Sequence, residues 1–202
     1  MKTRQKIYLP FKRLFGLIGA LVGIVICFVF LWIWVLPINF FVTKGHPFFL
    51  HKRYGKNKKI FGMVKFRSMK LDANPNIPPN LITQEQQDEM ETKFGKFLRA
   101  SSIDETPQLF NILIGQMSFI GPRPGAAVNE EDLVEYRDAQ ECNPFSMKPG
   151  ITGLAQVKMK REHNPKLKAE FDSEYVKKIS FFLDIKIFFK TLVKIFSDLK
   201  GK

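Results

Sequence analysis

Two adjacent carboxylates, Asp104 and Glu105, come directly before Thr106-Pro107, a residue pair typical of a helix start. The first-turn N–H groups of a helix have no partners within the helix, and the helix dipole favours anions there. An aspartate in this place stays ionised and can act as a nucleophile, the chemistry by which carboxylates form acyl phosphates. Glu105 is a hard oxygen ligand, and Mg²⁺ usually binds one or two carboxylates together with substrate phosphates. On local sequence alone, acidic residues that merely decorate a helix terminus are the simpler interpretation.

Basic residues elsewhere in the chain could place positive charge near this pair. Arg123 stands between Pro122 and Pro124, where the stiff backbone fixes the direction of its side chain. Side chains alternate along a strand, so Lys65 and Arg67 share one face. An arginine supplies a bidentate fork and a lysine a point charge, which together suit a diphosphate. The alternative for each residue is an ordinary surface salt bridge. The basic candidates are Lys65, Arg67, Arg123, Lys160 and Arg161.

A few short strands and several helices must position these residues. A basic turn between two apolar runs predicts a β-hairpin that carries Lys65 on its second strand. Thr83-x-x-Gln86 is a capping box and predicts the start of a polar helix. Because the strands are too few for a doubly wound sheet, we expect an α+β fold that is mostly helical. The expected elements are a hairpin over 48–69, a loop at 72–80, helices over 83–98, 106–115, 130–142, 165–178 and 182–199, and tight loops at 121–125 and 149–153.

Residues 14–42 contain no charged side chain. As one straight helix they would run roughly 44 Å, against about 30 Å of bilayer hydrocarbon. The stretch is too long for the apolar region of a signal peptide, so we do not expect its removal. Basic residues flank both ends, which favours a re-entrant helix with both flanks on the cytoplasmic side and Pro37 as the candidate break. A single tilted span is the alternative. Gly19-x-x-x-Gly23 fits either helix packing or lipid exposure.

The charge distribution favours a lipid surface over nucleic acid as the partner. The net charge is +13, and the first seventy residues hold fourteen Lys and Arg but no Asp or Glu. Because an apolar stretch splits this basic block, we expect anionic membrane lipid and no nucleic acid. Two Cys and three His without HExxH spacing exclude a disulfide framework, a four-Cys zinc module and a zincin. We expect a membrane-embedded part over 1–45 and a cytoplasmic catalytic domain at the membrane surface over 46–202.

The last expected helix has a basic stripe. Lys186, Lys190 and Lys194 are spaced four residues apart, and apolar residues cover most of the remaining surface. This pattern fits an amphipathic helix in the membrane interface with its lysines at the headgroups. A core-packing helix with a solvated stripe fits equally well.

Four motifs in sequence order carry a family resemblance. They are Lys65-Phe-Arg-Ser-Met69, Leu98-Arg-x-x-Ser-Ile-Asp-Glu-x-Pro-Gln-Leu-Phe-Asn111, Met117-Ser-Phe-Ile-Gly-Pro-Arg-Pro124 and Lys148-Pro-Gly-Ile-Thr-Gly-Leu-Ala-Gln-Val157. With these motifs the chain resembles the monotopic phosphoglycosyl transferases, bacterial sugar transferases of the small single-domain type. The tail from Asp172-x-x-Tyr175 to Asp184 is also similar to that family, so the resemblance covers nearly everything from Phe48 to about Phe196.

The resemblance implies a reaction in two steps. Asp104 would attack the β-phosphate of a nucleotide diphosphate sugar, a UDP-sugar, releasing a nucleoside monophosphate and forming a covalent aspartyl-phosphosugar. Polyprenol phosphate, as undecaprenyl phosphate, would then take the phosphosugar in the initiating step of glycoconjugate assembly. The resemblance implies Mg²⁺ held by Glu105. It also implies these substrate-binding residues: Lys65, Arg67, Arg123, Gln156, Lys160, Arg161 and Asp172.

The resemblance further implies a bacterial plasma-membrane protein with a re-entrant anchor and its catalytic domain on the cytoplasmic face; a homodimer is compatible with it. Family members often have Ser-Pro in the middle of the anchor, where residues 27–34 here have none. They often have Asn-Gly-Arg where this chain has Lys158-Met159-Lys160, so either Lys160 or Arg161 takes the place of the arginine. No motif names the sugar. The alternative function is a non-catalytic protein that binds anionic lipid, which needs no carboxylate pair beside stiff arginine loops.

Overall fold

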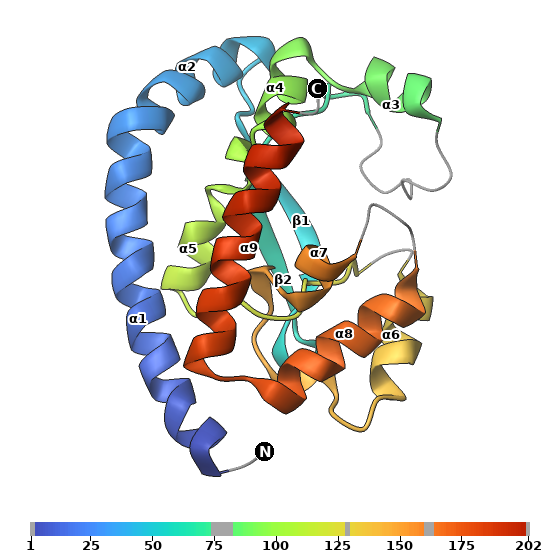
Figure 1. Cartoon of the computed structure of the whole chain (residues 1–202). Helices are drawn as coiled ribbons and strands as arrows, with labels where there is room; N and C mark the ends of the chain where they lie inside the picture. Colours follow the sequence, from blue (N-terminus) through green and yellow to red (C-terminus); the bar gives the residue numbers. More distant parts are fainter. Residues whose placement is uncertain (1–2, 74–82, 128–129, 160–163, 201–202) are drawn as a thin grey trace.

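The computed structural model describes residues 3–73, 83–127, 130–159 and 164–200. Those residues form a mostly helical structure with two small two-stranded sheets, which confirms the α+β class (Figure 1). The elements are α1 (Thr3–Cys27), the π-helical segment η1 (Phe28–Trp32), α2 (Ile33–Val42), β1 (Phe48–Tyr54), η2 (Lys56–Lys58), β2 (Ile60–Phe66), α3 (Gln84–Met90), α4 (Lys93–Ala100), η4 (Ile103–Glu105), α5 (Gln108–Leu113), β3 (Ser118–Ile120), α6 (Glu131–Asp138), η5 (Pro144–Ser146), β4 (Gly150–Thr152), α7 (Leu154–Lys158), α8 (Pro165–Lys178) and α9 (Phe181–Lys200).

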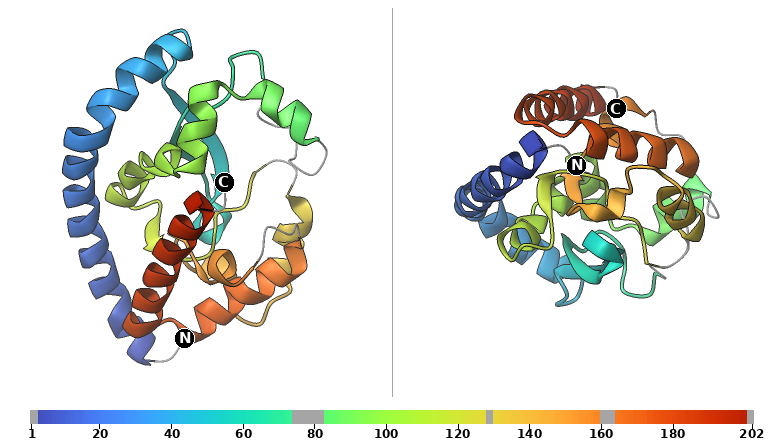
Figure 2. Two further views of the ribbon diagram at one scale, coloured as in Figure 1. Left: turned by 45° about the horizontal axis from the view of Figure 1, so that its top comes forward. Right: turned by 90° about the horizontal axis from the view of Figure 1, so that it is seen from below.

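The apolar N-terminal segment is a long helix that turns partway along its length. α1 runs up one side of the domain, and the helix axis turns between α1 and α2, so that α2 crosses over one end of the domain (Figures 1 and 2). Hydrogen bonding changes to the π pattern in η1, a type of irregularity that accompanies helix bends. Pro37, the expected break, lies inside α2 instead. Within the described residues this is the one helix long and apolar enough to span a membrane.

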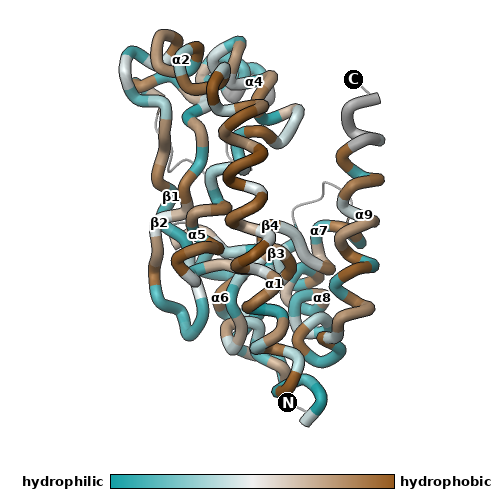
Figure 3. Tube along the Cα trace, turned by 90° about the vertical axis from the view of Figure 1, so that its left-hand side faces the viewer, coloured by the Kyte–Doolittle hydropathy of each residue, from teal (hydrophilic) through white to brown (hydrophobic). Residues whose placement is uncertain are grey.

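One face of α1 packs against the domain through glycines. A Cβ atom at Gly19 would lie 3.0 Å from the Phe119 ring, and one at Gly23 would lie 3.2 Å from Leu109. The small-residue face therefore lets the helix backbone approach the domain closely, which decides between the two interpretations of the glycine spacing. The helix is mostly hydrophobic along its length (Figure 3), and the side chains that point away from the domain remain exposed. The exposed apolar residues include Phe11, Phe15, Ile18, Val22, Val25 and Ile26 of α1 and Phe30 of η1.

Polar contacts hold the apolar segment to the domain near its start and at its bend. Near the N-terminus, Lys12 pairs with Asp184 at 2.6 Å. The guanidinium of Arg13 donates to the carbonyl of Leu113, at 2.9 Å, and to that of Ile112, and so caps the end of α5. At the end of η1, the Trp32 indole donates to the hydroxyl of Thr106 at 2.9 Å. The apolar segment is therefore held to the domain both near its start and at the bend.

The predicted hairpin is confirmed. β1 and β2 pair antiparallel with Phe48 opposite Phe66 and Tyr54 opposite Ile60. The turn at η2 contains Asn57 with φ of 54°, a left-handed conformation that asparagine tolerates well. The Asn111 side chain of α5 accepts from the N–H of Val64 and donates to the carbonyl of Gly62, and so fixes the hairpin against the helix.

The single helix predicted over 83–98 forms as two helices, α3 and α4. The capping box at its start is confirmed: Thr83 Oγ1 accepts from the N–H of Gln86, and Gln86 Oε1 accepts from the N–H of Thr83. A second N-cap divides the predicted helix in two. The hydroxyl of Thr92 accepts from the N–H of Gly95 at 2.8 Å and starts α4.

A second sheet, which the sequence analysis did not predict, holds the loop that carries Arg123. β3 and β4 are parallel, with Ser118 opposite Gly150. A Cβ atom at Gly153 would lie only 2.0 Å from the carbonyl oxygen of Gly121, so only glycine allows this approach of the two loops. The tight loops expected at 121–125 and 149–153 therefore pack directly against each other.

The closing helix α9 leaves most of its apolar side uncovered. Ile187 is buried in a cluster with Tyr175 and Val176 of α8. On the other side Phe182 and Val193 are 82% and 69% exposed. An apolar face of this kind favours the membrane-interface interpretation of α9 over the core-packing one.

Candidate active site

The two carboxylates lie in η4, a single 3₁₀ turn between α4 and α5. Ser102 before it has φ of 57°, which reverses the chain sharply after α4. Thr106 is itself in helical conformation, and its hydroxyl donates to the carbonyl of Ile103 at 2.8 Å instead of capping α5. The expected cap at Thr106 is therefore wrong in detail, since the helical path begins earlier and Pro107 is the residue before α5. Asp104 is buried at 6% exposure, in the turn that leads into α5.

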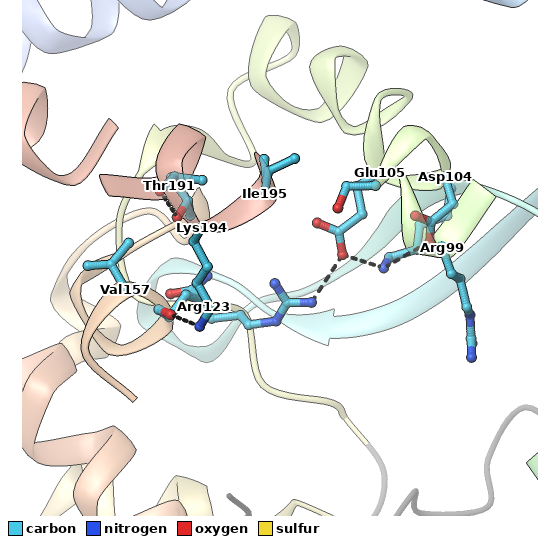
Figure 4. A pocket seen from close by; sticks show the side chains of 12 residues that line it. Arg99, Asp104, Glu105, Arg123, Val157, Thr191, Lys194 and Ile195 are labelled. Atoms are coloured by element: carbon cyan, nitrogen blue, oxygen red, sulfur yellow. Dashed lines mark hydrogen bonds and ion pairs between the residues drawn. The ribbon is translucent and has the colours of Figure 1, made fainter. Parts of the chain in front are cut away.

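Two of the predicted cations converge on Glu105 (Figure 4). Lys65 Nζ lies 2.7 Å and Arg123 Nη2 lies 3.0 Å from the same atom, Glu105 Oε1. Lys65 Nζ also lies 3.8 Å from Asp104 Oδ2. The hairpin and the proline-flanked loop thus deliver one cation each to the carboxylate pair.

The two carboxylates differ electrostatically. Burial alone would raise the pKa of Glu105, but the charges and hydrogen bonds of Arg123 and Lys65 outweigh it and lower the pKa to about 2. Burial raises the pKa of Asp104, the charge of Glu105 adds to this, and Lys65 only partly opposes it. Burial in this site therefore opposes the ionisation of Asp104 that the helix terminus favours. Glu105 is the permanent anion and Asp104 the more easily protonated partner.

Both carboxylates line a cleft of about 530 Å³. Its walls come from the hairpin, the end of α4, the Arg123 loop, β4, α7 and α9. Four of its lining residues are cations and two are carboxylates, a balance that suits a substrate with several negative charges. The lining residues are Lys65, Arg99, Ser102, Asp104, Glu105, Arg123, Thr152, Gln156, Val157, Thr191, Lys194 and Ile195.

Lys194 and Arg99 line the cleft, where the sequence analysis did not place them; it had assigned Lys194 to the headgroup stripe of the last helix. Lys194 Nζ donates to the carbonyl of Gln156 at 2.5 Å and to that of Met159 at 3.2 Å, at the end of α7. It is less exposed than Lys186 and Lys190, the other lysines of its stripe, which face outward. The four-residue spacing predicts which face of the helix carries Lys194, but not that the carbonyls at the end of α7 lie beside it. No sequence signal therefore distinguished Lys194 from Lys186 and Lys190.

The other predicted binding residues divide into three groups. Gln156 lines the cleft, and its buried Oε1 has no hydrogen-bond partner among the described residues. Arg67 does not line the cleft: its Nε donates to the carbonyl of His46 at 3.2 Å, and its guanidinium stacks on Phe49. Lys160 and Arg161 lie outside the described residues.

Asp172 also lies away from the cleft lining. It is fully buried and forms an ion pair with Arg137, which is itself 2% exposed. The same Arg137 Nη2 donates to the carbonyl of Arg123 at 2.7 Å. Through Arg137, Asp172 therefore supports the backbone of the Arg123 loop, and we interpret it as a positioning residue.

The donor set for Mg²⁺ is small. Among the described residues no group of three or more His, Cys, Asp and Glu could hold a metal. Lys65 and Arg123 both pair with Oε1 of Glu105, however, and in the described part of the chain no hydrogen bond or ion pair involves its Oε2. Because Glu105 lines the cleft, this second oxygen fits a Mg²⁺ ion that takes its remaining ligands from substrate oxygens and water.

Comparisons with known proteins agree with this geometry. The family model described as "Bacterial sugar transferase" matches residues 7–198. The chain is 40% identical to the UDP-glucose:undecaprenyl-phosphate glucose-1-phosphate transferase of Klebsiella pneumoniae, over 75% of this chain and 33% of that protein. It is 34% identical to the galactosyl transferase CpsE of Streptococcus agalactiae, over 95% of this chain and 43% of that one. It is 33% identical to the exopolysaccharide production protein ExoY of Rhizobium meliloti, over 90% and 83%. The chain spans about a third of the length of the first of these relatives.

Proposed function

This chain belongs to the bacterial sugar transferases, and from that premise we propose that it transfers a sugar phosphate from a nucleotide diphosphate sugar to a polyprenol phosphate. The names of its relatives support a UDP-sugar as donor and undecaprenyl phosphate as acceptor. The observation that carries the proposal is the buried Asp104 beside Glu105 in a cleft lined by four cations. A diphosphate brings the negative charge that such a cleft lacks.

In the first step, an oxygen of the Asp104 carboxylate attacks the β-phosphorus of the donor. The bond between this phosphorus and the bridging oxygen breaks, and a nucleoside monophosphate leaves with that oxygen. The product is a sugar phosphate linked to Asp104 as an acyl phosphate. Lys65 and Arg123 lie beside the carboxylates and can stabilise the charge that develops on the phosphoryl oxygens.

In the second step, a phosphate oxygen of the polyprenol phosphate attacks the same phosphorus. The acyl phosphate bond breaks, Asp104 is released as a carboxylate, and a polyprenyl-diphospho-sugar leaves. Attack by an anion on an anion needs a site that offsets repulsion, which the basic walls of the cleft provide. Two displacements at one phosphorus also make the reaction reversible through the same intermediate.

Mg²⁺ held by Glu105 Oε2 would supply positive charge to the diphosphate and its leaving group. The protein's own contribution is to keep Glu105 ionised, which the neighbouring Arg123 and Lys65 do by lowering its pKa to about 2. At neutral pH this carboxylate is therefore always available as a ligand.

We place the protein at the cytoplasmic face of the plasma membrane, with α1 and α2 as a re-entrant anchor. The segment contacts one domain near its start, through Lys12, and at the bend after α1, through Trp32, and the chain passes from α2 into the hairpin of that same domain, which supports entry and exit on one side. The uncovered apolar faces of α1 and α9 supply the surface for lipid contact. Polyprenol phosphate, itself a lipid, would reach the cleft along that surface.

The test incubates the purified protein with a panel of nucleotide sugars and undecaprenyl phosphate and measures release of nucleoside monophosphate. We expect release with one or a few donors, and a radiolabelled sugar phosphate that stays attached to denatured protein and is removed by hydroxylamine. Asp104→Asn abolishes both signals, because an amide cannot form the acyl phosphate. Asp132→Asn, an exposed acid on α6, is the matched control and keeps both.

Folding of the variant is checked separately. Burial raises the pKa of Asp104, so the folded state binds its proton more tightly than the unfolded state does. Ionised Asp104 therefore lowers stability as pH rises through its folded pKa, and Asp104→Asn removes that cost at neutral pH. The variant should melt no lower than wild type. A folded Asp104→Asn protein with near-normal turnover would end the covalent mechanism, and a wild type inert towards every donor would favour a non-catalytic lipid-binding protein.

A further inference from the structure

A second pocket lies beside the N-terminal half of α1, near the C-terminal end of α5. The carboxylates of the cleft lie at the opposite end of α5, just before its N-terminus. It has a volume of about 130 Å³. Its walls come from α1, from the residues after α5, from the hairpin turn at η2 and from the segment that follows η5. None of its lining residues belongs to the cleft that holds Asp104.

Three cations in this pocket have no acidic partner. Arg13, Lys56 and Lys148 form no ion pair within the described residues, whereas Lys12 beside them is neutralised by Asp184. Arg13 and Lys148 are close neighbours, because a Cβ atom at Gly115 would lie 3.2 Å from Arg13 Nη2 and 3.3 Å from Lys148 Nζ. Burial lowers the pKa of Lys148, and the charges of Arg13 and Lys56 lower it further. Like charges gathered without a counter-ion lower stability unless an anion joins them.

The rest of the pocket is apolar. Ile112, Met117 and Met147 form its buried lining, and each is under 10% exposed. Leu9, Arg13 and Gly16 contribute one face of α1, at helical spacings of four and three residues. Outward from this face, α1 carries the uncovered apolar side chains of the membrane segment. A ligand here would meet cations at one end and hydrocarbon at the other.

We propose that this pocket binds the phosphate of an anionic glycerophospholipid, with the lipid chains along α1. The cations match a phosphate, and methionines and aliphatic side chains match the beginning of an acyl chain. A free phosphate would satisfy the cations but leave the apolar lining unused. Such a lipid would hold the N-terminal half of α1 against the C-terminal end of α5 through Arg13, which also caps α5. The site is independent of the transfer reaction proposed above.

The test measures lipid binding to the full-length protein in a neutral detergent, without nucleotide sugar. Native mass spectra give the Kd for dihexanoyl-phosphatidylglycerol, and inorganic phosphate is the second probe. The variant is Lys56→Gln with Lys148→Gln. Each basic residue near a lipid phosphate contributes roughly a fivefold factor, so the pair should raise the Kd about 30-fold. Lys52→Gln with Lys59→Gln, two exposed lysines of the same hairpin, removes equal charge outside the pocket and should change the Kd less than about threefold.

Stability separates loss of the site from loss of the fold. Because Lys56 and Lys148 repel their neighbours, their replacement should leave the melting temperature in lipid-free detergent unchanged or higher. Added lipid should raise the melting temperature of wild type but not of the double variant. Equal lipid affinity of the two double variants would overturn the proposal. So would inorganic phosphate that binds as tightly as the lipid, because the site would then be a simple anion site. Absence of lipid binding to wild type would overturn it as well, whatever the outcome of the transferase assay.

Discussion

Asp172→Asn should destabilise the protein strongly, although the residue does not itself line the cleft. The change removes one negative charge and keeps the size of the side chain. It leaves Arg137, 2% exposed, without its counter-charge in the interior. An arginine does not lose its proton in a protein. Burial raises the pKa of Asp172 against the charge of Arg137, yet the carboxylate is the one acidic group paired with that guanidinium in the described residues.

The magnitude follows from this burial. Breaking a buried ion pair by removing one partner costs about 3–5 kcal/mol. For a chain of this size each kcal/mol corresponds to about 2–4 °C, so the melting temperature should fall by roughly 6–20 °C. Replacement of both partners, Arg137→Met with Asp172→Leu, removes the stranded charge and should recover most of that loss.

The assay is thermal unfolding of the purified protein in detergent, followed by turnover measurement below the melting point. Asp138→Asn is the matched control, because its ion pair with Lys58 lies at the surface and should matter by less than about 1 kcal/mol. Asp172→Asn should lose turnover through the Arg123 loop, whose carbonyl Arg137 holds. A melting temperature of Asp172→Asn equal to that of Asp138→Asn, with only a raised KM for the donor, would refute this role of Asp172. Asp172 would then contact substrate, as the sequence analysis supposed.

Three further predictions concern the metal, the pH profile and the anchor. EDTA should abolish turnover and Mg²⁺ restore it, and Glu105→Gln should raise the Mg²⁺ concentration needed; full activity in EDTA would contradict this. Because burial raises the pKa of Asp104, the pKa of the acid limb of the kcat/KM profile should lie above 3.8, the usual value for aspartate. Lys65→Met removes an opposing charge and should raise that pKa further. A pKa at or below 3.8 would refute the assignment of this limb to Asp104. A cysteine at Thr3, in a chain freed of its two native cysteines, should resist an impermeant maleimide in intact cells and react once the membrane is opened; labelling of intact cells would establish a spanning helix.

Local signals in the sequence predicted the elements that local contacts define. The helix expected over 165–178 forms with those same bounds, because Asn164 caps it and Pro165 begins it. The strands β3 and β4 have three residues each and exist through contacts between distant segments, such as Gly121 against Gly153. No local pattern could give them.

The site shows the same division. The carboxylate pair and the cations at Lys65 and Arg123 could be predicted, because residue type and a proline-stiffened loop indicate their chemistry. The roles of Asp172 and Lys194 depend on what lies beside them in space, Arg137 for one and the carbonyls ending α7 for the other. Periodicity predicts on which face of a helix a residue lies, but not which residue lies opposite it. The structure was therefore needed to find these two roles.

Lys65 and Arg123 share one oxygen of Glu105, so a substrate anion would have to compete with an anion of the protein itself. In the resting cleft Glu105 already pairs with both cations, and a single phosphate would gain little by entering. In the reaction proposed above, a donor diphosphate would replace the carboxylate at both cations at once, and Glu105 would then be free to bind the proposed Mg²⁺. Once the products leave, Glu105 would pair with its cations again. Preference for a metal-bound diphosphate over a single phosphate would thus follow from two cations that share one acceptor atom.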